Sequence, residues 1–205
     1  MINEISSKSF ENIDNKNQFN PDKKMDINER TDIAAKPKEY SLDARIESYK
    51  DDNGKEYRVG DNLIPNNQYE INGYSYKTDN MGRIVSAEGT LHLKKHEGRL
   101  PIKDSLETIA HGEQRKNDDR GHIVGDQFDG SNGMENITAQ DSKENQGVYK
   151  KLEDQLANEI KQGKEVKYRI DIHYDEKSYI PTDRVYHYSI NGEKHMQIFP
   201  NGGVK

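Results

Sequence analysis

The segment DRGHIVGDQFDGSNGMENITAQDSKENQGVYKKLEDQL, residues 119–156, decides how this chain folds. It opens with Asp119-Arg120-Gly121-His122, turns through a Gly/Asn-rich stretch at residues 129–133, and is extended again at residues 135–140. Apolar residues then recur at helical spacing over residues 146–162, and Gly163 follows as a C-cap. The pattern predicts a strand, a turn, a second strand and a helix in direct succession.

Further strands are predicted on both sides of this unit. Residues 68–93 alternate in polarity and turn at Asn72-Gly73, which predicts an antiparallel β-meander. After the helix, strands are expected at residues 165–174, 183–190 and 193–199, the last two joined by the hairpin dipeptide Asn191-Gly192. With a short helix expected near residues 105–112, the chain is predicted to be an α+β protein with an antiparallel sheet.

Apolar residues are unevenly distributed along the chain. Hydrophobic residues make up 30% of the 205 positions and charged residues 33%. A hydrophobic core can therefore form only if the apolar residues are concentrated in one part of the chain. Residues 1–58 are rich in Asn, Asp, Lys, Glu and Ser and have too few apolar positions to offset chain entropy. We therefore expect a flexible or disordered N-terminal arm over residues 1–58 and one folded domain over residues 59–205.

Charge and composition exclude several classes of site. The net charge is −6, with 16 basic against 18 acidic residues up to residue 100 and 15 against 19 after it, so neither half is a basic nucleic-acid footprint. A few cations beside a metal can still hold one scissile phosphate. The absence of cysteine excludes disulfides, thiolate metal sites and cysteine nucleophiles.

No membrane partner is expected for this chain. No stretch approaches the roughly 18 consecutive apolar residues of a membrane span, and the N-terminus lacks an apolar signal region. If the protein is exported, the signal lies elsewhere or the chain is a fragment of something longer.

His122 and Asn145 have the chemistry that phosphodiester hydrolysis requires. A neutral histidine can take a proton from water near pH 7, and a divalent ion can stabilise the charge on the phosphate and the leaving oxygen. An asparagine carbonyl is an uncharged oxygen ligand of the kind that Mg²⁺ accepts. The two residues are 23 positions apart, and the predicted strand, turn, strand and helix can bring them into one small volume.

These residues resemble the DNA/RNA non-specific endonuclease family, whose ββα-metal (His-Me finger) active site carries an Asp-Arg-Gly-His signature. The resemblance covers roughly residues 62–200 and is closest over residues 119–162. It implies a ββα-metal nuclease core and Mg²⁺-dependent hydrolysis of DNA, with Mn²⁺ as an alternative ion and RNA left open as a second substrate. It implies that His122 is the general base, Asn145 the direct protein ligand of the metal, and Arg120 a phosphate contact.

The same resemblance implies supporting roles for three other residues. Asn136 would support the site, Glu153 would hold a metal-bound water or orient its neighbours, and Asp119 would fix the strand end by accepting hydrogen bonds. Some family members have an arginine one helical turn after the glutamate, where this chain has Ala157. A second phosphate-binding cation is therefore unassigned, and the sequence leaves open Arg115, Lys116 and Arg83.

The strands after the helix resemble the branch found at the C-terminal ends of secreted bacterial polymorphic toxins. That context implies delivery into a target cell and a cognate immunity protein as partner. Two alternatives remain: a secreted scavenging nuclease without an immunity partner, and a catalytically inactive β-rich binding module.

Several residues also have structural interpretations. Asn145 could be a helix N-cap, and Glu153 a solvated residue of the helix face. His92 and His96 are four residues apart on a predicted strand and loop, which would not hold paired metal ligands together. Most of the 12 tyrosines sit at alternating strand positions, where packing is their usual role.

Overall fold

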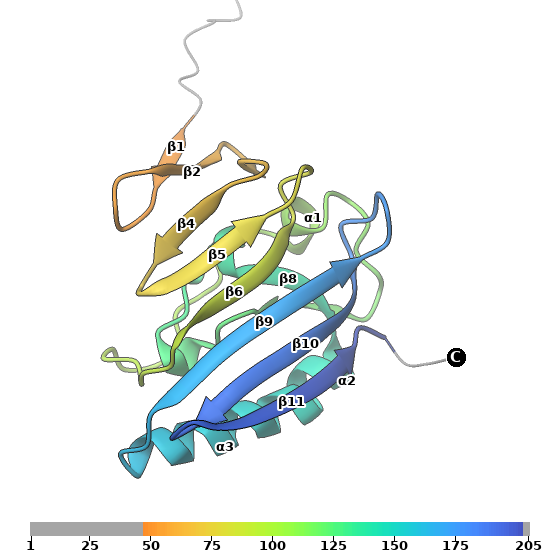
Figure 1. Ribbon diagram of the computed structural model, residues 1–205. Coiled ribbons are helices and arrows are strands. Elements are labelled where there is room, and N and C mark those ends of the chain that lie inside the picture. The colour runs from red at the N-terminus through yellow and green to blue at the C-terminus, as the bar shows by residue number, and fades with distance from the viewer. Residues whose placement is uncertain (1–46, 203–205) are drawn as a thin grey trace, which may run out of the picture. The chain divides into compact units, whose positions relative to one another are not determined.

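Six antiparallel strands form the main sheet of the computed structural model, which describes residues 47–202 (Figure 1). The strand order is β11-β10-β9-β6-β5-β4, so the strands before the predicted unit lie beside those after it. The strands are β4 (Gln68–Ile71), β5 (Tyr74–Thr78), β6 (Ile84–Thr90), β9 (Val166–Tyr174), β10 (Pro181–Ile190) and β11 (Glu193–Pro200). Each lies where the sequence predicts a strand, and the α+β class with an antiparallel sheet is confirmed.

The two Asn-Gly hairpins form as predicted. Asn72 and Gly73 have φ of 55° and 78°, and Asn191 and Gly192 have φ of 49° and 88°. Two successive residues with positive φ match the twist of the flanking strands, which is why Asn-Gly is favoured there.

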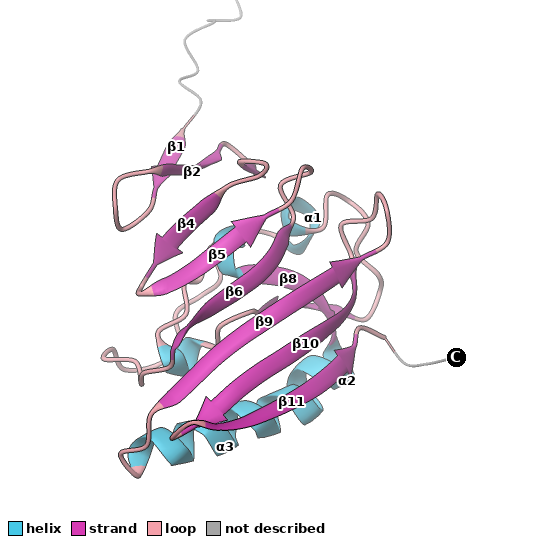
Figure 2. Cartoon of the chain, in the orientation of Figure 1, coloured by secondary structure: helices cyan, strands magenta, loops and turns pink. Residues whose placement is uncertain are grey.

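The predicted strand, turn, strand and helix form a second layer on one face of the sheet (Figure 2). Strands β7 (Asp118–His122) and β8 (Ile137–Asp141) pair antiparallel, and α3 (Lys150–Lys161) follows. The helical region begins earlier than α3, with α2 (Ser142–Glu144) and a π-helical turn, η3 (Asn145–Tyr149). Short helical turns complete the layer: α1 (Leu106–Ile109), η1 (Asp126–Phe128) and η2 (Met134–Asn136).

Aromatic side chains fill the space between α3 and the sheet. Tyr149 lies 5.0 Å from Tyr186 between ring centroids, and Tyr186 lies 4.8 Å from Phe199. Leu156, from the apolar face of α3, is 1% exposed. The tyrosines therefore act mainly as core residues, as their alternation predicts. No helix among the described residues is long and apolar enough to cross a membrane.

The boundary that we expected between residues 58 and 59 differs from the structure. Strands β1 (Ser48–Lys50), β2 (Glu56–Val59) and β3 (Asn62–Leu63) form a small sheet of their own. Tyr57 is buried and stacks on Tyr69 at 5.0 Å, and Arg58 forms a bidentate ion pair with Asp104. Residues 47–58 are thus folded and are held by aromatic and ionic contacts. Disorder was predicted from the sequence because the number of apolar residues in the segment was considered and these contacts were not. The rest of the expected arm, residues 1–46, lies outside the described residues.

We expect Tyr57→Ala to lower the free energy of unfolding by about 3 kcal/mol, because truncating a buried aromatic residue leaves a cavity. Urea unfolding followed by circular dichroism would measure the change. Tyr49→Ala, at a half-buried neighbouring position, is the control and should cost less. Equal unfolding midpoints for Tyr57→Ala and the unmodified chain would show that β1 and β2 do not stabilise the domain.

Candidate active site

Gly121 allows the two strands of the site to cross closely. A Cβ at this position would lie 2.0 Å from the side-chain carbon of Gln140 on the paired strand β8. Gln140 fills that space and donates a hydrogen bond from Nε2 to the carbonyl oxygen of His122 at 3.2 Å. The glycine of the Asp-Arg-Gly-His motif therefore serves the packing that holds the end of β7.

His122, the predicted general base, is buried at the end of β7 with its Nε2 without a hydrogen-bond partner. Burial lowers its pKa to about 4, and the positive charge of Arg99 acts in the same direction, while Asp126 opposes both. The imidazole is consequently neutral at pH 7. A neutral imidazole that lines a cavity can accept a proton from a water molecule there.

Asn136 fixes the chain that follows His122. Its side chain is fully buried; Oδ1 accepts from the backbone N–H of Val124 at 2.8 Å and from the hydroxyl of Tyr76 at 3.1 Å. Its Nδ2 donates to the carbonyl oxygens of Val124 and Ser131 at 2.8 and 2.7 Å. Asn136 does not line the cleft, so its contribution to the site is made through the backbone that it holds.

Asn145 and Asp119 meet across the strand and the helix. Asn145 donates from Nδ2 to Oδ2 of Asp119 at 3.3 Å, and Gln146 donates to the same oxygen at 2.7 Å. The bond from Asn145 uses its donor group and leaves Oδ1 available as a ligand. The N-cap interpretation does not hold, because Asp141 caps this helical region and Asn145 lies in the π-helical turn.

Glu153 faces the interior of the site. Its Oε1 is buried without a hydrogen-bond partner, and burial raises the pKa of the carboxyl to about 7. A Cβ on Gly125 would lie 2.1 Å from this oxygen, so the glycine leaves room for the carboxyl group beside the loop after His122. The position is not the solvated helix face that the sequence left open.

These side chains line one continuous cleft. His122, Asn145 and Glu153 line a cavity of about 470 Å³, which also contains Asp126 and Lys150. Arg99, Asn145 and Gln146 are shared with an adjoining cavity of about 480 Å³ that is lined by Asp119 and Arg120. Of the six predicted site residues, the structure brings five into the cleft and places Asn136 behind it.

Arg120 makes structural contacts beside the cleft, in addition to the phosphate contact predicted for it. Its Nη1 donates to the carbonyl oxygens of Ile102 and Asp104 at 3.3 and 3.0 Å, which braces the wall formed by residues 99–102. The side chain is otherwise exposed. The phosphate contact that the sequence predicts remains a prediction.

Arg99 was missed by the sequence reasoning and lies at the centre of the cleft wall. It is exposed and lines both cavities. Its charge lowers the pKa of both His122 and Glu153. In the sequence, Arg99 is only one of several basic residues in the polar segment before the Asp-Arg-Gly-His motif, so nothing there pointed to a role in the site.

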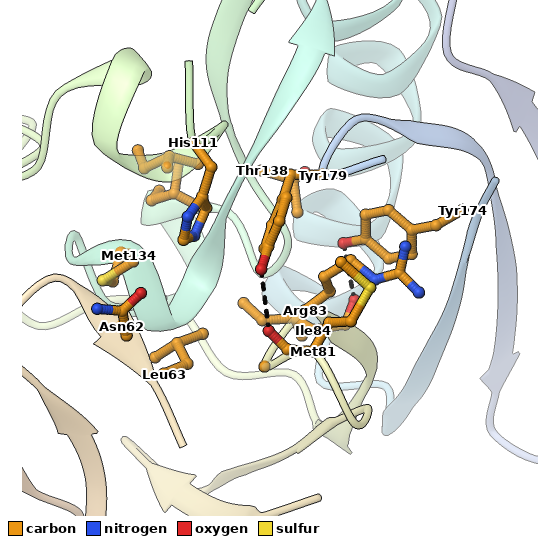
Figure 3. Close-up of a pocket in the computed structure, with 13 residues that line it drawn as sticks. Asn62, Leu63, Met81, Arg83, Ile84, His111, Met134, Thr138, Tyr174 and Tyr179 are labelled. Carbon is orange, nitrogen blue, oxygen red and sulfur yellow. Dashed lines mark hydrogen bonds between the residues drawn. The ribbon is translucent and has the colours of Figure 1, made fainter. Parts of the chain in front are cut away.

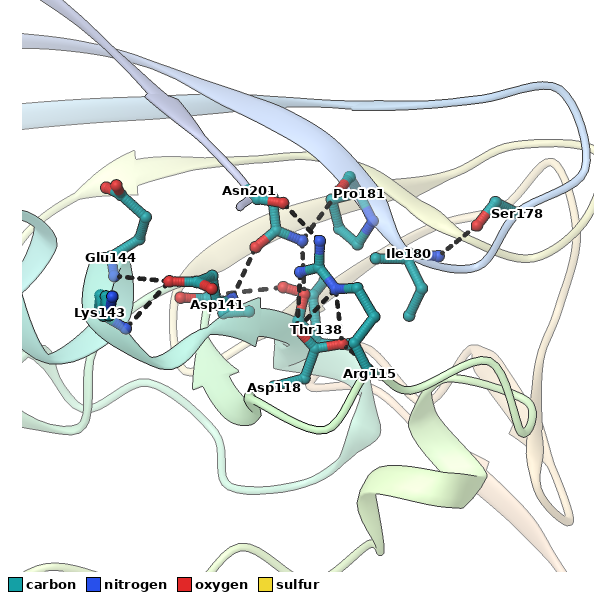
Figure 4. Close-up of polar contacts among 12 residues, drawn as sticks. Arg115, Asp118, Thr138, Asp141, Lys143, Glu144, Ser178, Ile180, Pro181 and Asn201 are labelled. Atoms are coloured by element: carbon teal, nitrogen blue, oxygen red, sulfur yellow. Dashed lines mark hydrogen bonds and ion pairs between the residues drawn. The ribbon is translucent and has the colours of Figure 1, made fainter. Parts of the chain in front are cut away.

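The other cations that the sequence left open do not line the cleft. Arg115 is bound to Asp118 at 2.6 Å and to the carbonyl oxygen of Asn201 at 2.7 Å (Figure 4). Arg83 pairs with Asp79 at 2.6 Å and lines a separate cavity of about 30 Å³ with His111 and Tyr179 (Figure 3). That cavity has room for water but not for a nucleotide.

The donor atoms of the cleft fit a hard divalent ion. Within residues 47–202, no group of three His, Asp or Glu side chains is arranged to hold a metal ion. An ion at this site would therefore depend on Oδ1 of Asn145 together with water and substrate oxygens. Mg²⁺ commonly keeps several waters and uses one or two protein ligands, so the residues present are compatible with it.

A family model described as DNA/RNA non-specific endonuclease matches residues 65–192. The chain belongs to this family. Its members are metal-dependent hydrolases of phosphodiester bonds in nucleic acid. The ββα core predicted from the motif is the unit formed by β7, β8 and α3.

Similarity to individual proteins is more distant. The type VII secretion system protein EssD of Staphylococcus aureus strains USA300 and NCTC 8325 is 28% identical over 141 residues. The match covers 63% of this chain and 22% of EssD, so the chain spans about a fifth of the length of these relatives. A solved structure of Sda1 nuclease with bound zinc ion aligns with a TM-score of 0.44 and 12% identity, over 80% of this chain and 87% of that chain.

His122 and Glu153 should affect stability with opposite dependence on pH. The folded-state pKa of His122 is about 4, below its ordinary value of 6.5, so its contribution is complete above pH 6.5 and is lost as the pH falls toward 4. The pKa of Glu153 is raised from 4.5 to about 7, so its contribution is complete below pH 4.5 and is lost as the pH rises through 7.

In the unmodified chain, deprotonation of His122 should raise the free energy of unfolding as the pH rises from 4 to 6.5, and His122→Gln should lack this rise. Deprotonation of Glu153 should lower the free energy of unfolding as the pH rises through 7, and Glu153→Gln should lack this fall. Urea midpoints measured from pH 4 to pH 8 would give both differences. Parallel curves for the two variants would contradict the opposite shifts.

Proposed function

We propose that this domain hydrolyses phosphodiester bonds of DNA in a Mg²⁺-dependent reaction with little sequence preference, and that RNA is a second substrate. The observation that carries the proposal is that His122 and Asn145 line one cavity, the first with a neutral imidazole and the second with an available Oδ1. Glu153 adds a buried carboxyl group to the same cavity.

His122 acts as the general base. Burial keeps the imidazole neutral, so the ring, which lines the cavity, can take a proton from the water that attacks phosphorus. The hydrogen bond from Gln140 to the His122 backbone and the network of Asn136 hold the ring at the cavity. Such positioning is part of catalysis, because the water, the base and the phosphate must be aligned before reaction.

Asn145 is the residue that would hold the metal ion. Asp119 accepts from its Nδ2, which fixes the side-chain amide and would leave Oδ1 to coordinate the ion. Bound Mg²⁺ supplies positive charge for the phosphate oxygens and the leaving 3′ oxygen.

Arg99 and Arg120 hold the substrate backbone. Arg99 lies on the wall shared by the two cavities, and Arg120 lies in the outer one. A phosphate that spans this wall meets two guanidinium groups, which bind phosphate oxygens with directional, charge-assisted hydrogen bonds. Glu153, with a pKa near 7, can orient a water molecule of the cleft by donating or accepting a hydrogen bond.

A role in bacterial antagonism is supported by the similarity to a type VII secretion system protein. We propose that the domain is the toxin part of a secreted protein, delivered into a target cell and neutralised by an immunity protein in the producing cell. A scavenging nuclease would need no such protein. A binding module would not require the unpartnered buried groups of His122 and Glu153.

Purified protein should degrade plasmid DNA and structured RNA with Mg²⁺ and not with EDTA. His122→Ala should lower the rate by about 10²–10⁴-fold, because general base catalysis contributes that much. Asn145→Ala should require a higher Mg²⁺ concentration for half-maximal rate. His173→Ala, on the exposed face of β9, is the control that should retain full activity. Folded, unmodified protein that cleaves neither substrate with any divalent ion would refute the enzyme and leave the binding module.

Expression of the domain in a bacterial cytoplasm should stop growth and fragment the chromosome, while His122→Ala should permit normal growth at equal protein level. Co-expression with the gene that neighbours the toxin gene should restore growth if that gene encodes the immunity protein. Normal growth with active enzyme present in the cytoplasm would favour the scavenging nuclease.

A further inference from the structure

The segment that carries Arg99 is held to the rest of the domain mainly by polar contacts. It leads from the end of the β-meander to the cleft wall, and most of it is exposed. Leu100, its large apolar residue, is 44% exposed and so contributes little packing. The backbone N–H of Lys94 donates to the carbonyl oxygen of Gln127 at 3.0 Å at the beginning of the segment.

The carboxylate of Asp126 closes this segment into a loop. Its Oδ2 accepts from Nζ of Lys94 at 2.5 Å, and its Oδ1 accepts from the backbone N–H of Leu100 at 3.3 Å. Lys94 also donates to the carbonyl oxygen of Gly98. One side chain thus joins the first and last residues of the stretch 94–100, and its second contact is adjacent to Arg99.

Asp126 is well placed to transmit this constraint to the active site. It begins the turn η1, four residues after His122, and its side chain is 12% exposed. The Asn136 network holds the preceding backbone at Val124, so the carboxylate is attached to a fixed part of the domain. A charge-assisted hydrogen bond that is partly shielded from water is stronger than one at the surface.

We propose that Asp126 is a positioning residue, which holds the loop of residues 94–100 so that Arg99 lies across the cleft beside His122. The proposal rests on the proposed function, in which Arg99 binds the phosphate. Asp126 acts through Lys94 and the backbone of Leu100. Loss of either partner of the ion pair releases the same loop.

A double-mutant cycle tests whether Asp126 acts through Arg99. Arg99→Ala should lower kcat/KM by about ten- to a hundredfold, because a hydrogen bond to a charged group is worth about 1.5–3 kcal/mol. Asp126→Asn should give most of that loss, and the double variant should lose no more than Arg99→Ala alone. Losses that multiply in the double variant, while the unmodified chain cleaves normally, would overturn the proposal and leave the proposed function intact.

Variants of the partner residue separate positioning from general damage. Lys94→Met should reproduce the effect of Asp126→Asn. Lys94→Arg should keep the ion pair with Asp126 and most of the activity. Asp79→Asn is the matched control, because Asp79 is also a partly buried aspartate paired with a cation, but lies away from the cleft. It should lower stability without changing kcat/KM.

Hydrogen–deuterium exchange gives a readout that does not depend on activity. The amide of Leu100 should exchange faster in Asp126→Asn and Lys94→Met than in the unmodified chain, and at its normal rate in Asp79→Asn. Unchanged exchange in all variants would overturn the proposal even if the protein had no nuclease activity. Absence of cleavage with faster exchange at Leu100 would instead reject the proposed function and retain the role of Asp126 in holding the loop.

Discussion

The rest of the site depends on the hydrogen bonds made by the buried side chain of Asn136. Its amide binds the backbone of Val124 through both a donor and an acceptor, and also binds Ser131 and Tyr76. Asn136 therefore joins two parts of the connection between β7 and β8, and it also joins this connection to the main sheet through Tyr76. Inside a protein an unmade hydrogen bond is costly, so these four bonds specify one path for the chain. The positions of His122, Gly125 and Asp126 follow from that path.

Burial, more than direct charge pairing, sets the protonation of the two central groups. It lowers the pKa of His122 and raises that of Glu153, so both groups favour their neutral forms. Glycine at positions 121 and 125 permits this burial, since a side chain at either would collide with Gln140 or Glu153. Close packing of backbone and side chains is thus what keeps the His122 imidazole neutral near physiological pH.

The sequence was sufficient to predict the order of elements because the signals for them are local. Alternating polarity, two Asn-Gly hairpins and one amphipathic helix each depend on neighbouring residues, and the motif gave the position of His122 on its strand. It was not sufficient for features that depend on distant contacts. The π-helical turn at Asn145, the folding of residues 47–58 and the place of Arg99 in the cleft all depend on residues far away in the sequence.

The acidic side chains that line the two cavities are offset by their surroundings. Asp119 faces the side-chain amides of Asn145 and Gln146, and Asp126 faces Lys94. Glu153 has a pKa near 7 and so carries only part of a negative charge at neutral pH. The cations that line the two cavities are Arg99, Arg120 and Lys150, and Lys150 is paired with Asp154. A net charge of −6 is therefore compatible with binding a polyanion, because charge within a Debye length of about 8–10 Å has the largest effect on the substrate.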